Sequence, residues 1–441
     1  SSPETHTSDD SGYSVVVDTT APEVSGITFS SSNGSSDPDH PSSHLAMEGD
    51  TVTLSITTDE RVEDVEVVIN ETSYSADDDG DGTSWTVEHT VSSGEDVESV
   101  EFEITSFSDP SGNALSSPET HTSDDSGYSV VVDTTAPEVS EVSFESSNDA
   151  NDPDLPNTLL AKAGELVTFT FTTSERVKEV VVQFDNTTVE ATDSGGGKNW
   201  VASRVVESGE TSDKVVFKVN SLSDSSGNEL VTEDVRTQDK DTQSVRVDTT
   251  APVVEADSVK LLSSNSGRQH GNAEIQLAKV GDNLTLSFTS TERLAAEPTP
   301  RVKVNGQELV AAPQPITSDG KQWRAIYSAQ ASDTGVVSFE FVSGFDPVGN
   351  PLATVTPTSP GTVSVDNQLP LLPEVKLISE NVNTSGQLPQ LAKTGDNVTL
   401  KVQSSEAVAE LLLTRRNGQP EPMIPVDDTR TLWSYSRVTE D

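Results

Sequence analysis

Acidic side chains recur at three fixed places in a chain that repeats its own sequence. The first is the aspartate of the phrase V-D-T-T-A-P, the second is the glutamate that closes a following apolar run, and the third is the aspartate of the phrase D-x-x-G-N. Carboxylates that lie close together repel one another unless a proton or a cation separates them. A cation bound by six to eight oxygen atoms relieves this repulsion, and Ca2+ suits flexible loop ligands better than Mg2+. In chain order the positions hold Asp18, Glu60 and Asp109; Asp133, Glu175 and Asp224; Asp248, Glu292 and Asp346; and Asp366 and Glu406.

The repeat itself has a long period. Residues 1–25 recur letter for letter at 116–140, and the aspartates of the V-D phrase lie about 115 to 118 residues apart. This spacing exceeds the 20 to 50 residues of solenoid repeats and matches one small domain per repeat. We therefore predict the following division: the tail of a preceding repeat at 1–18, full repeats at 19–133, 134–248 and 249–366, and a truncated repeat at 367–441.

Within a repeat, apolar residues alternate with polar ones. Val52, Leu54 and Ile56 lie between threonines and serines, which is the period-two pattern of strands with one buried face. Turn-forming clusters separate such runs, and no amphipathic helix is evident. The predicted fold is all-β, a tandem of immunoglobulin-like antiparallel β-sandwich domains arranged as beads on a string. The strands expected in the first repeat are 24–30, 51–58, 64–70, 72–76, 84–91, 98–106 and 127–132.

This topology gives the repeated acids a common location. In such a sandwich the entering chain, the B–C loop and the F–G loop lie at one pole, so each set of three should converge at the N-terminal pole of its repeat. Acidic loops of the preceding repeat should face the same gap. Two interpretations stay open: a calcium site at each junction, or solvated loops in which Glu60 simply pairs with Arg61. The acidic loop residues are Asp37, Asp39, Glu95 and Asp96, and then Asp152, Asp154, Glu210 and Asp213.

A second calcium candidate lies in the first repeat. Asp77, Asp79, Asp81, Gly82 and Glu88 match the spacing of an EF-hand calcium loop. The flanking segments are predicted strands rather than helices, and the second repeat has no such acids. The alternatives are an acidic hairpin loop and a calcium site formed by the three aspartates.

Composition excludes several functions. Acidic residues number 74 and basic residues 26, for a net charge of −48, which argues against binding nucleic acid. The absence of cysteine excludes disulfides, zinc–thiolate sites and thiol nucleophiles. No apolar run reaches the roughly 20 residues of a membrane-spanning helix. No motif of a hydrolase or metalloprotease is present, so we do not expect an enzyme. One tryptophan per repeat, at 85, 200, 323 and 433, is either core or a platform for sugars.

The quoted phrases, together with L-A-K-x-G-D-x-V-T-L-x-F-T-x-S-E, resemble bacterial Ig-like repeats. The resemblance is clearest at 160–177 and 277–294, whereas Glu165 and 366–370 depart from it. Such repeats occur in large secreted or surface-attached proteins, including repeats-in-toxin-type adhesins. The resemblance implies an extracellular or cell-surface extender segment, often calcium-dependent. It would be a monomeric rod whose glycan or protein partner is bound by modules outside this segment. The alternative is that some repeats bind a glycan or protein partner themselves, and the third repeat, with Arg268 and His270, has loops of its own.

Overall fold

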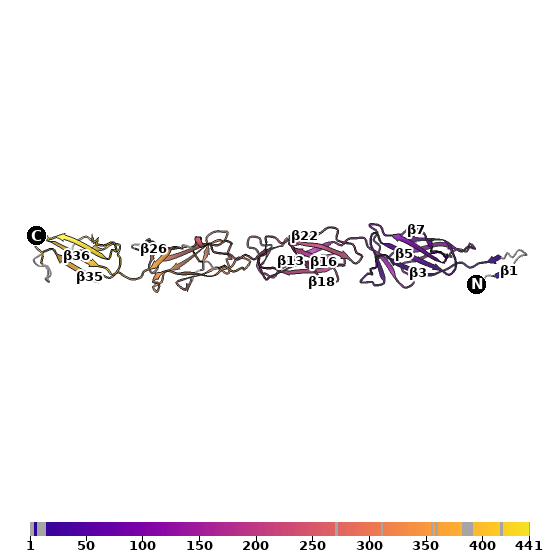
Figure 1. Cartoon of the computed structure of the whole chain (residues 1–441), viewed down its shortest axis with the longest axis horizontal. Coiled ribbons are helices and arrows are strands. Elements are labelled where there is room, and N and C mark those ends of the chain that lie inside the picture. The colour runs from indigo at the N-terminus through magenta and orange to yellow at the C-terminus, as the bar shows by residue number, and fades with distance from the viewer. Residues whose placement is uncertain are drawn as a thin grey trace. The chain divides into compact units, whose positions relative to one another are not determined.

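The computed structural model describes residues 4–6, 15–269, 272–309, 312–353, 356–357, 360–381, 391–414 and 418–440. The chain forms two compact units, Ser1–Thr249 and Thr250–Asp441. Figure 1 shows that strands and loops make up nearly all of both units. Unit 1 contains the first and second repeats, which are residues 19–133 and 134–248. Unit 2 contains the third repeat, up to residue 366, and the fourth repeat from residue 367. The division of the chain into individual repeats stays a prediction from the sequence.

The first repeat is a sandwich of two sheets. Its strands are β3 (Val24–Ser31), β4 (Ser43–Ala46), β5 (Thr51–Thr58), β6 (Glu63–Ile69), β7 (Thr72–Ser75), β8 (Asp77–Asp78), β9 (Ser84–Thr90), β10 (Phe102–Ser108), β11 (Glu119–His121) and β12 (Ser129–Val132). One antiparallel sheet has the order β3-β5-β9-β8 and the other has the order β11-β10-β6-β7, while β4 pairs in parallel with β12. These are the A-B-E-D and C′-C-F-G sheets of an immunoglobulin-like domain. The predicted fold class is therefore confirmed.

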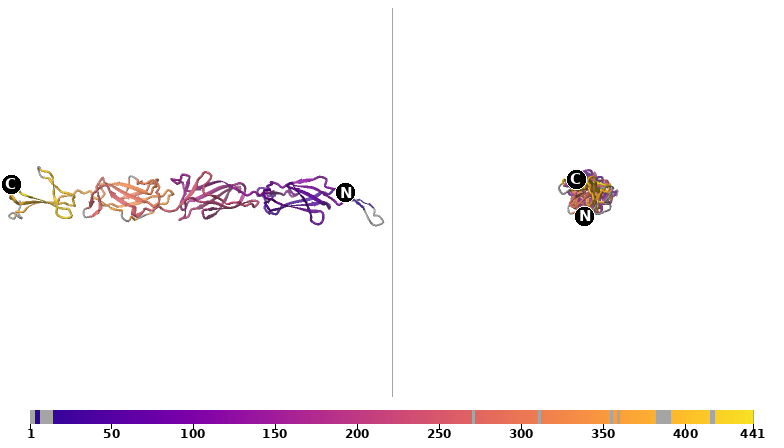
Figure 2. Two further views of the ribbon diagram at one scale, coloured as in Figure 1. Left: turned by 90° about the horizontal axis from the view of Figure 1, so that it is seen from above. Right: turned by 90° about the vertical axis from the view of Figure 1, so that its left-hand side faces the viewer.

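The second repeat has the same strand order. Its strands are β13 (Val139–Ser146), β14 (Thr158–Ala161), β15 (Leu166–Thr173), β16 (Val177–Phe184), β17 (Thr187–Glu190), β18 (Thr192–Gly195), β19 (Asn199–Val205), β20 (Thr211–Ser212), β21 (Phe217–Asp224), β22 (Asp234–Arg236) and β23 (Ser244–Asp248). The sheets are β13-β15-β19-β18, β17-β16-β21-β22 and β14-β23-β20. Figure 2 shows this repeat in magenta, with its strands lying roughly along one axis. Ahead of both repeats, β1 (Glu4–His6) pairs with β2 (Val15–Val17).

Unit 2 begins with the third repeat. A 3-10 turn, η1 (Ala256–Ser258), precedes its strands. The strands are β24 (Lys260–Ser263), β25 (Arg268–Gln269), β26 (Asn272–Ala278), β27 (Asn283–Thr289), β28 (Arg301–Val304), β29 (Gln307–Glu308), β30 (Gln314–Pro315), β31 (Gln322–Ser328), β32 (Gly335–Val336), β33 (Phe339–Ser343) and β34 (Thr362–Val365). They form the sheets β24-β27-β31-β30, β29-β28-β33 and β25-β26-β34-β32.

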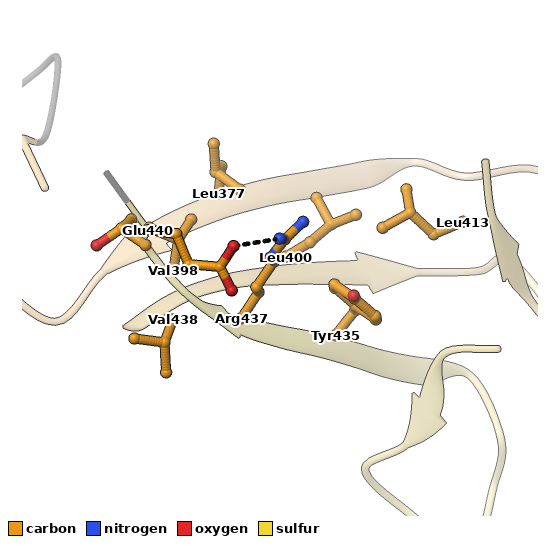
Figure 3. Close-up of a pocket in the computed structure, with 9 residues that line it drawn as sticks. Leu377, Val398, Leu400, Leu413, Tyr435, Arg437, Val438 and Glu440 are labelled. Atoms are coloured by element: carbon orange, nitrogen blue, oxygen red, sulfur yellow. Dashed lines mark hydrogen bonds and ion pairs between the residues drawn. The ribbon is translucent and has the colours of Figure 1, made fainter. Parts of the chain in front are cut away.

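The fourth repeat supplies one complete four-stranded sheet. Its strands are β35 (Glu374–Ser379), β36 (Asn397–Gln403), β37 (Leu412–Leu413), β38 (Glu421–Pro422), β39 (Ile424–Pro425) and β40 (Leu432–Val438). The sheet β35-β36-β40-β39 has an open apolar face with a hollow of about 560 Å³. Figure 3 shows Leu377, Leu400 and Tyr435 around this hollow. Leu377 pairs with Leu400 as Phe29 pairs with Leu54 in the first repeat, but Leu377 is 68% exposed and Phe29 only 2%. We therefore regard the hollow as an open core rather than as a ligand site.

The period-two pattern explains which side chains enter the core. In β5 the residues Val52, Leu54 and Ile56 are fully buried, whereas the intervening threonines and serine lie partly exposed. Full burial of such side chains contributes about 1.5–3 kcal/mol each. Four separate clusters of buried hydrophobic residues result, and each draws its members from a different segment of the chain. The sandwich thus holds its loops on a packed framework.

The tryptophans belong to these cores. Trp85, Trp200, Trp323 and Trp433 are all at least 93% buried. In each, the indole Nε1 donates to the carbonyl three residues earlier in the chain, as Trp85 does to Gly82 at 3.3 Å. A buried ring with a satisfied N–H cannot present its face to a sugar. The core interpretation is therefore confirmed, and the sugar-platform interpretation is wrong.

Some predicted strand limits were wrong. The strand expected at 98–106 begins only at Phe102, because Val97 and Val100 instead hydrogen-bond across to the 130–132 segment. The strand expected at 127–132 is shorter, and β11 precedes it as a second edge segment. The short strands β4 and β8 were not predicted, because four and two residues are too few to show alternation. β4 matters most, since its parallel pairing with β12 fixes the end of the repeat from which the linker leaves.

Candidate metal centre

The chain positions each acid of a set by a different element. At the entry to the second repeat, Asp133 directly follows β12, and its amide donates to the Ala46 carbonyl at 2.9 Å. Glu175 lies two residues after β15, and Asp224 is the last residue of β21. The linker, the B–C turn and the start of the F–G loop therefore each supply one carboxylate. This is the arrangement that the immunoglobulin-like topology predicts.

The carboxylates of a set converge. One oxygen of each of Asp133, Glu175 and Asp224 lies within 4.8 Å of the others. The carboxylate oxygens of Asp18, Glu60 and Asp109 also lie within 4.8 Å of one another. Within each set these residues lie 42 to 91 positions apart in the sequence, so only the fold brings them together. The predicted convergence at one pole of the repeat is confirmed for both sets. We name these groups centre 1 (Asp18, Glu60 and Asp109) and centre 2 (Asp133, Glu175 and Asp224).

The buried member of each centre is held by its own loop. Asp224 Oδ1 accepts the amide N–H groups of Gly227 at 2.6 Å and Asn228 at 2.9 Å, while Oδ2 accepts Asn228 Nδ2 at 2.7 Å. Gly227 has a φ of 105°, a conformation that favours glycine. Asp109 is bound in the same way by Asn113. The D-x-x-G-N phrase is thus a turn that fixes its aspartate with an oxygen edge towards the linker.

The asparagine of this phrase also reaches the linker. Asn228 Nδ2 donates to the backbone carbonyl of Asp133 at 2.8 Å, and Asn113 Nδ2 donates to that of Asp18 at 3.2 Å. One amide group therefore joins the F–G loop to the chain that enters the repeat. This asparagine was not among the predicted site residues, although its regular recurrence four residues after each aspartate was a signal for the contact.

A hydroxyl fixes the glutamate of each set. Thr173 Oγ1 donates to the Glu175 carbonyl at 2.6 Å, and Thr58 Oγ1 donates to the Glu60 carbonyl at 2.6 Å. Ser290 and Ser404 bind the corresponding carbonyls in the third and fourth repeats. The expected alternative was an ion pair between the glutamate and the arginine beside it. In the second repeat Arg176 instead binds Asp39 Oδ1 at 2.9 Å.

The electrostatics of centre 2 oppose three ionised carboxylates. Burial raises the pKa of Glu175 to about 7, and the negative charges of Asp133 and Asp224 act in the same direction. Burial also raises the pKa of Asp133, and the charges of Asp224 and Asp96 add to this effect. Lys198 offsets only part of the repulsion at Glu175. The group therefore favours an added positive charge, which a proton or a metal cation can supply.

Centre 1 shows the same trend. Burial raises the pKa of Glu60, and the charges of Asp18 and Asp109 contribute to the shift. Burial of Asp109 acts to raise its pKa, but hydrogen bonds from Asn113 and neighbouring amides outweigh it and lower the pKa. The two shifts therefore have opposite directions: the carboxyl group of Asp109 becomes more acidic than usual and that of Glu60 less acidic.

The remaining two sets are present in part within unit 2. Glu292 and Asp346 have carboxylate oxygens within 4.8 Å of each other, and Asp346 accepts Asn350 Nδ2 at 2.8 Å. Their predicted partner Asp248 is the last residue of β23 in unit 1. In the fourth repeat, burial and the neighbouring Asp366 raise the pKa of Glu406. Glu406 Oε1 is buried and has no hydrogen-bond partner among the described residues.

These residues fit a hard divalent cation. Three carboxylates offer six oxygen atoms, and Ca2+ takes six to eight oxygen ligands from carboxylates, carbonyls and water. Histidine and cysteine do not contribute to centres 1 and 2, so the donor set differs from the nitrogen and sulfur ligands that zinc prefers. The orphaned oxygen of Glu406 also suits an added cation. The chemistry available to such a centre is binding and cross-linking of loops.

The EF-hand-like sequence forms a hairpin. Asp78 Oδ1 accepts the amides of Gly80 and Gly82, both at 2.9 Å, and so closes the turn between β8 and β9. Asp81 Oδ1 accepts the amides of Thr83 and Ser84, and Asp79 Oδ2 accepts Thr86 Oγ1. In the described part of the chain, residues 77–81 do not provide three converging carboxylates. The turn itself thus uses these acids.

The acidic loops of the preceding repeat differ in what they contact. Asp96 binds the linker through Thr134, and Asp39 binds Arg176 of the second repeat. Glu95 instead binds His89 within its own repeat, and Glu210 binds Arg204. The expectation that these loops face the junction is therefore met in the first repeat by Asp96 and Asp39. The other loop acids described here make contacts within their own repeat, such as Asp37 with His40, and Asp152 and Asp213 with Arg246.

Comparison with known proteins shows likeness at the level of fold. No protein-family model and no curated protein sequence matches the chain. An I-band fragment of titin is 11% identical, covers 80% of this chain and 100% of its own, and has a TM-score of 0.34. An ectodomain fragment of ICAM-5 is 12% identical, covers 94% of this chain and 98% of its own, and has a TM-score of 0.26. The full ectodomain of mouse nectin-like molecule 4 is 9% identical, with coverages of 73% and 94% and a TM-score of 0.21.

These similarities are too low to support an argument about function. The immunoglobulin-like class rests instead on the strand order of the repeats themselves. Among the described residues, no helix has the length and apolar character needed to cross a membrane.

Proposed function

We propose that the chain is a structural extender segment, or stalk, of a large secreted or cell-surface adhesin-like protein, and that Ca2+ stiffens the junctions between its repeats. In this function the repeats carry no chemistry of their own. They separate a binding or anchoring module, which engages a glycan or a cell-surface protein, from the cell surface. The observation that carries the proposal is the carboxylate group of centres 1 and 2, since each group includes the linker aspartate that enters the repeat.

The position of the linker aspartate explains how an ion would stiffen a junction. Asp133 directly follows the last strand of the first repeat, whereas Glu175 and Asp224 belong to loops of the second. A cation that binds all three therefore ties the end of one sandwich to the pole of the next. The bound carboxylates would hold the ion, and Asn228 would keep the F–G loop against the linker.

The free energy expected from calcium binding is small, but it is sufficient to favour an ordered junction. Calcium sites in extracellular modules have dissociation constants of about 10⁻⁴ to 10⁻³ M. At ten to a hundred times this concentration, binding stabilises the bound arrangement by about 1.4 to 2.7 kcal/mol. This corresponds to about a tenfold to hundredfold preference for the ordered junction. The sandwiches themselves should persist without calcium, because their cores do not depend on the ion.

The test compares the chain with calcium and with a chelator. Small-angle scattering should show a broader range of dimensions in the chelator, while thermal melting still shows folded sandwiches. A variant in which glutamine replaces Glu60, Glu175, Glu292 and Glu406 should lose this response. The matched control replaces four exposed glutamates outside the centres by glutamine: Glu48, Glu71, Glu207 and Glu274. Identical scattering with and without calcium in the unmodified chain would refute the proposal.

The alternative is that individual repeats bind a glycan or a protein themselves. The third repeat was the candidate, because its loops differ from those of the first two, but His270 lies outside the described residues. The buried tryptophans do not provide a platform for sugars in any repeat. A glycan array probed with the full chain separates the two functions, since an extender segment should give no calcium-dependent binding to any glycan.

A further inference from the structure

Asp96, in the E–F loop of the first repeat, holds the linker that carries Asp133. Its Oδ1 accepts the Thr134 amide at 2.6 Å and Thr134 Oγ1 at 2.9 Å, while Oδ2 accepts Thr135 Oγ1 at 2.8 Å. Both oxygens of one carboxylate thus bind two consecutive residues of the linker. Hydrogen bonds to a charged acceptor are stronger than those between neutral groups. The contact requires only groups of this chain.

The loop behind Asp96 is itself anchored. The neighbouring Glu95 accepts His89 Nε2 at 2.7 Å and the Ser92 amide at 3.0 Å. His89 is buried, and its Nδ1 lies 2.6 Å from the hydroxyl of Tyr74. The E–F loop is therefore fixed to strand β9 of the first sandwich. As a result, Asp96 offers the linker a rigid attachment rather than a free loop.

The same linker is held from the second repeat. Asn228 Nδ2 donates to the Asp133 carbonyl at 2.8 Å. Two further contacts join the repeats directly: Arg176 Nη2 binds Asp39 Oδ1 at 2.9 Å, and Asn33 Nδ2 donates to the Ser226 carbonyl at 2.9 Å. Asp133 is thereby placed between two sets of hydrogen bonds. Its carboxylate has a defined position before any ion binds.

The other repeats lack this acid. Val97 pairs with Val132 as Ser212 pairs with Val247, so Thr211 is the counterpart of Asp96 in the second repeat. In the third repeat, the pairing of Gly335 with Val365 places Thr334 at the same position. A threonine provides no carboxylate, and these linkers are held by backbone groups instead: Thr249 Oγ1 donates to the Glu210 carbonyl at 2.9 Å, and Asn367 Nδ2 donates to the Asp333 carbonyl at 2.9 Å. The sequences of the linkers do not explain this difference, because D-T-T-A-P follows both the first and the second repeats.

We propose that Asp96 is a positioning residue of centre 2, which orders the linker in advance and so strengthens the binding of Ca2+ by this centre. The proposal rests on the proposed function for its statement about calcium. Pre-ordering a ligand strengthens binding because less conformational freedom is lost when the ion arrives. The negative charge of Asp96 adds to the effect, since calcium affinity rises with the number of acidic groups.

The first experiment needs no calcium. Hydrogen exchange of the full chain in a chelator should show a protected Thr134 amide. Asp96→Thr, which installs the residue of the other repeats, should speed its exchange by about tenfold or more. Asp96→Asn keeps an acceptor for this amide and should have a smaller effect. The reciprocal Thr211→Asp should slow exchange in the segment after Asp248. Equal exchange of Thr134 in the unmodified chain and in Asp96→Thr would overturn the proposal.

The second experiment measures affinity. Isothermal titration with Ca2+ uses the full chain with Glu60→Gln, Glu292→Gln and Glu406→Gln, which leaves centre 2 intact. Adding Asp96→Thr should weaken binding about tenfold, whereas Glu88→Thr, which removes an exposed acid of β9 in the same repeat, should change it less than twofold. Equal affinity with and without Asp96 would overturn the positioning role. No calcium binding at all would overturn the proposed function and the affinity claim, while the exchange result would still decide whether Asp96 orders the linker.

Discussion

Proton competition at Glu175 gives a quantitative test of centre 2. Its pKa is raised to about 7, because burial and then the charges of Asp133 and Asp224 oppose its ionisation. A carboxylate binds calcium only in its ionised form, so the proton and the ion compete. The ionised fraction of such a group falls from about nine-tenths at pH 8 to about one-tenth at pH 6. Calcium affinity should therefore fall about tenfold over this range, and more steeply if the raised pKa of Asp133 contributes.

In the metal-free protein, the stability of the junction should fall as the pH rises, whereas calcium affinity rises with pH. The pKa of Glu175 in the folded state lies above its ordinary value of 4.5, so its protonated form favours folding. This stabilisation is complete below about pH 4.5 and is lost as the pH rises through about 7. In a chelator, stability of the junction should thus decrease between pH 5 and pH 8. With saturating calcium it should increase over the same interval, because binding improves as the carboxylate ionises.

The assay is isothermal titration at pH 6, 7 and 8 on the chain that retains only centre 2. We expect the dissociation constant to rise about tenfold from pH 8 to pH 6, with proton release on binding near pH 7. Glu175→Gln should abolish both the proton release and the steep pH dependence. A dissociation constant that stays within twofold between pH 6 and pH 8 would show that Glu175 is not a ligand. Aspartates with ordinary pKa values would remain ionised throughout this range.

Three further predictions follow from the contacts. Asn228→Ala should lower the free energy of unfolding of the second repeat by about 1–3 kcal/mol, because it leaves buried acceptors unsatisfied, and chemical denaturation with the exposed Asn186→Ala as control measures this loss. Trp200→Ala should cost about 3–5 kcal/mol through the cavity it creates, and a melting curve that matches the unmodified protein would contradict its place in the core. Replacing Asp77, Asp79 and Asp81 by asparagine should leave the number of calcium ions bound unchanged, since Asp79 and Asp81 already accept hydrogen bonds within the hairpin; a titration that shows one ion fewer would support the EF-hand-like site.

The convergence of the acids could be predicted from the sequence because it depends only on the order of strands and loops in the sandwich. Val52, Leu54 and Ile56 alternate clearly enough to place β5, and the glutamate after that strand must then lie in the B–C turn. The same reasoning placed Asp109 at the start of the F–G loop. Once the domain is a sandwich, these loops and the entering linker share a pole, whatever the details of packing. The short distances between the carboxylates then depend on local turns, and the D-x-x-G-N phrase is itself a turn sequence.

The sequence could not separate the loop acids from one another. Asp96 and Glu95 are adjacent and chemically alike, yet Asp96 faces the linker while Glu95 faces His89. Which neighbour points outward depends on where the short bridge at Val97 pairs with Val132. A pairing of single residues leaves no periodic signal. The contact between Arg176 and Asp39 was equally hidden, because 137 residues separate its partners.

The acidic sets are not a by-product of an acidic chain. Residues 19–133 contain 26 acidic residues and one basic residue, so chance alone could bring carboxylates together there. Residues 249–366 contain only 12 acidic and eight basic residues, yet Glu292 and Asp346 still have oxygens within 4.8 Å of each other. Surface charge thus differs widely between repeats, while the acids at the pole stay the same. Proximity of like charges costs folding energy, so its persistence argues for a cation that offsets the cost. On this reasoning, calcium should affect the third repeat as well as the first two, although its surface is far less acidic.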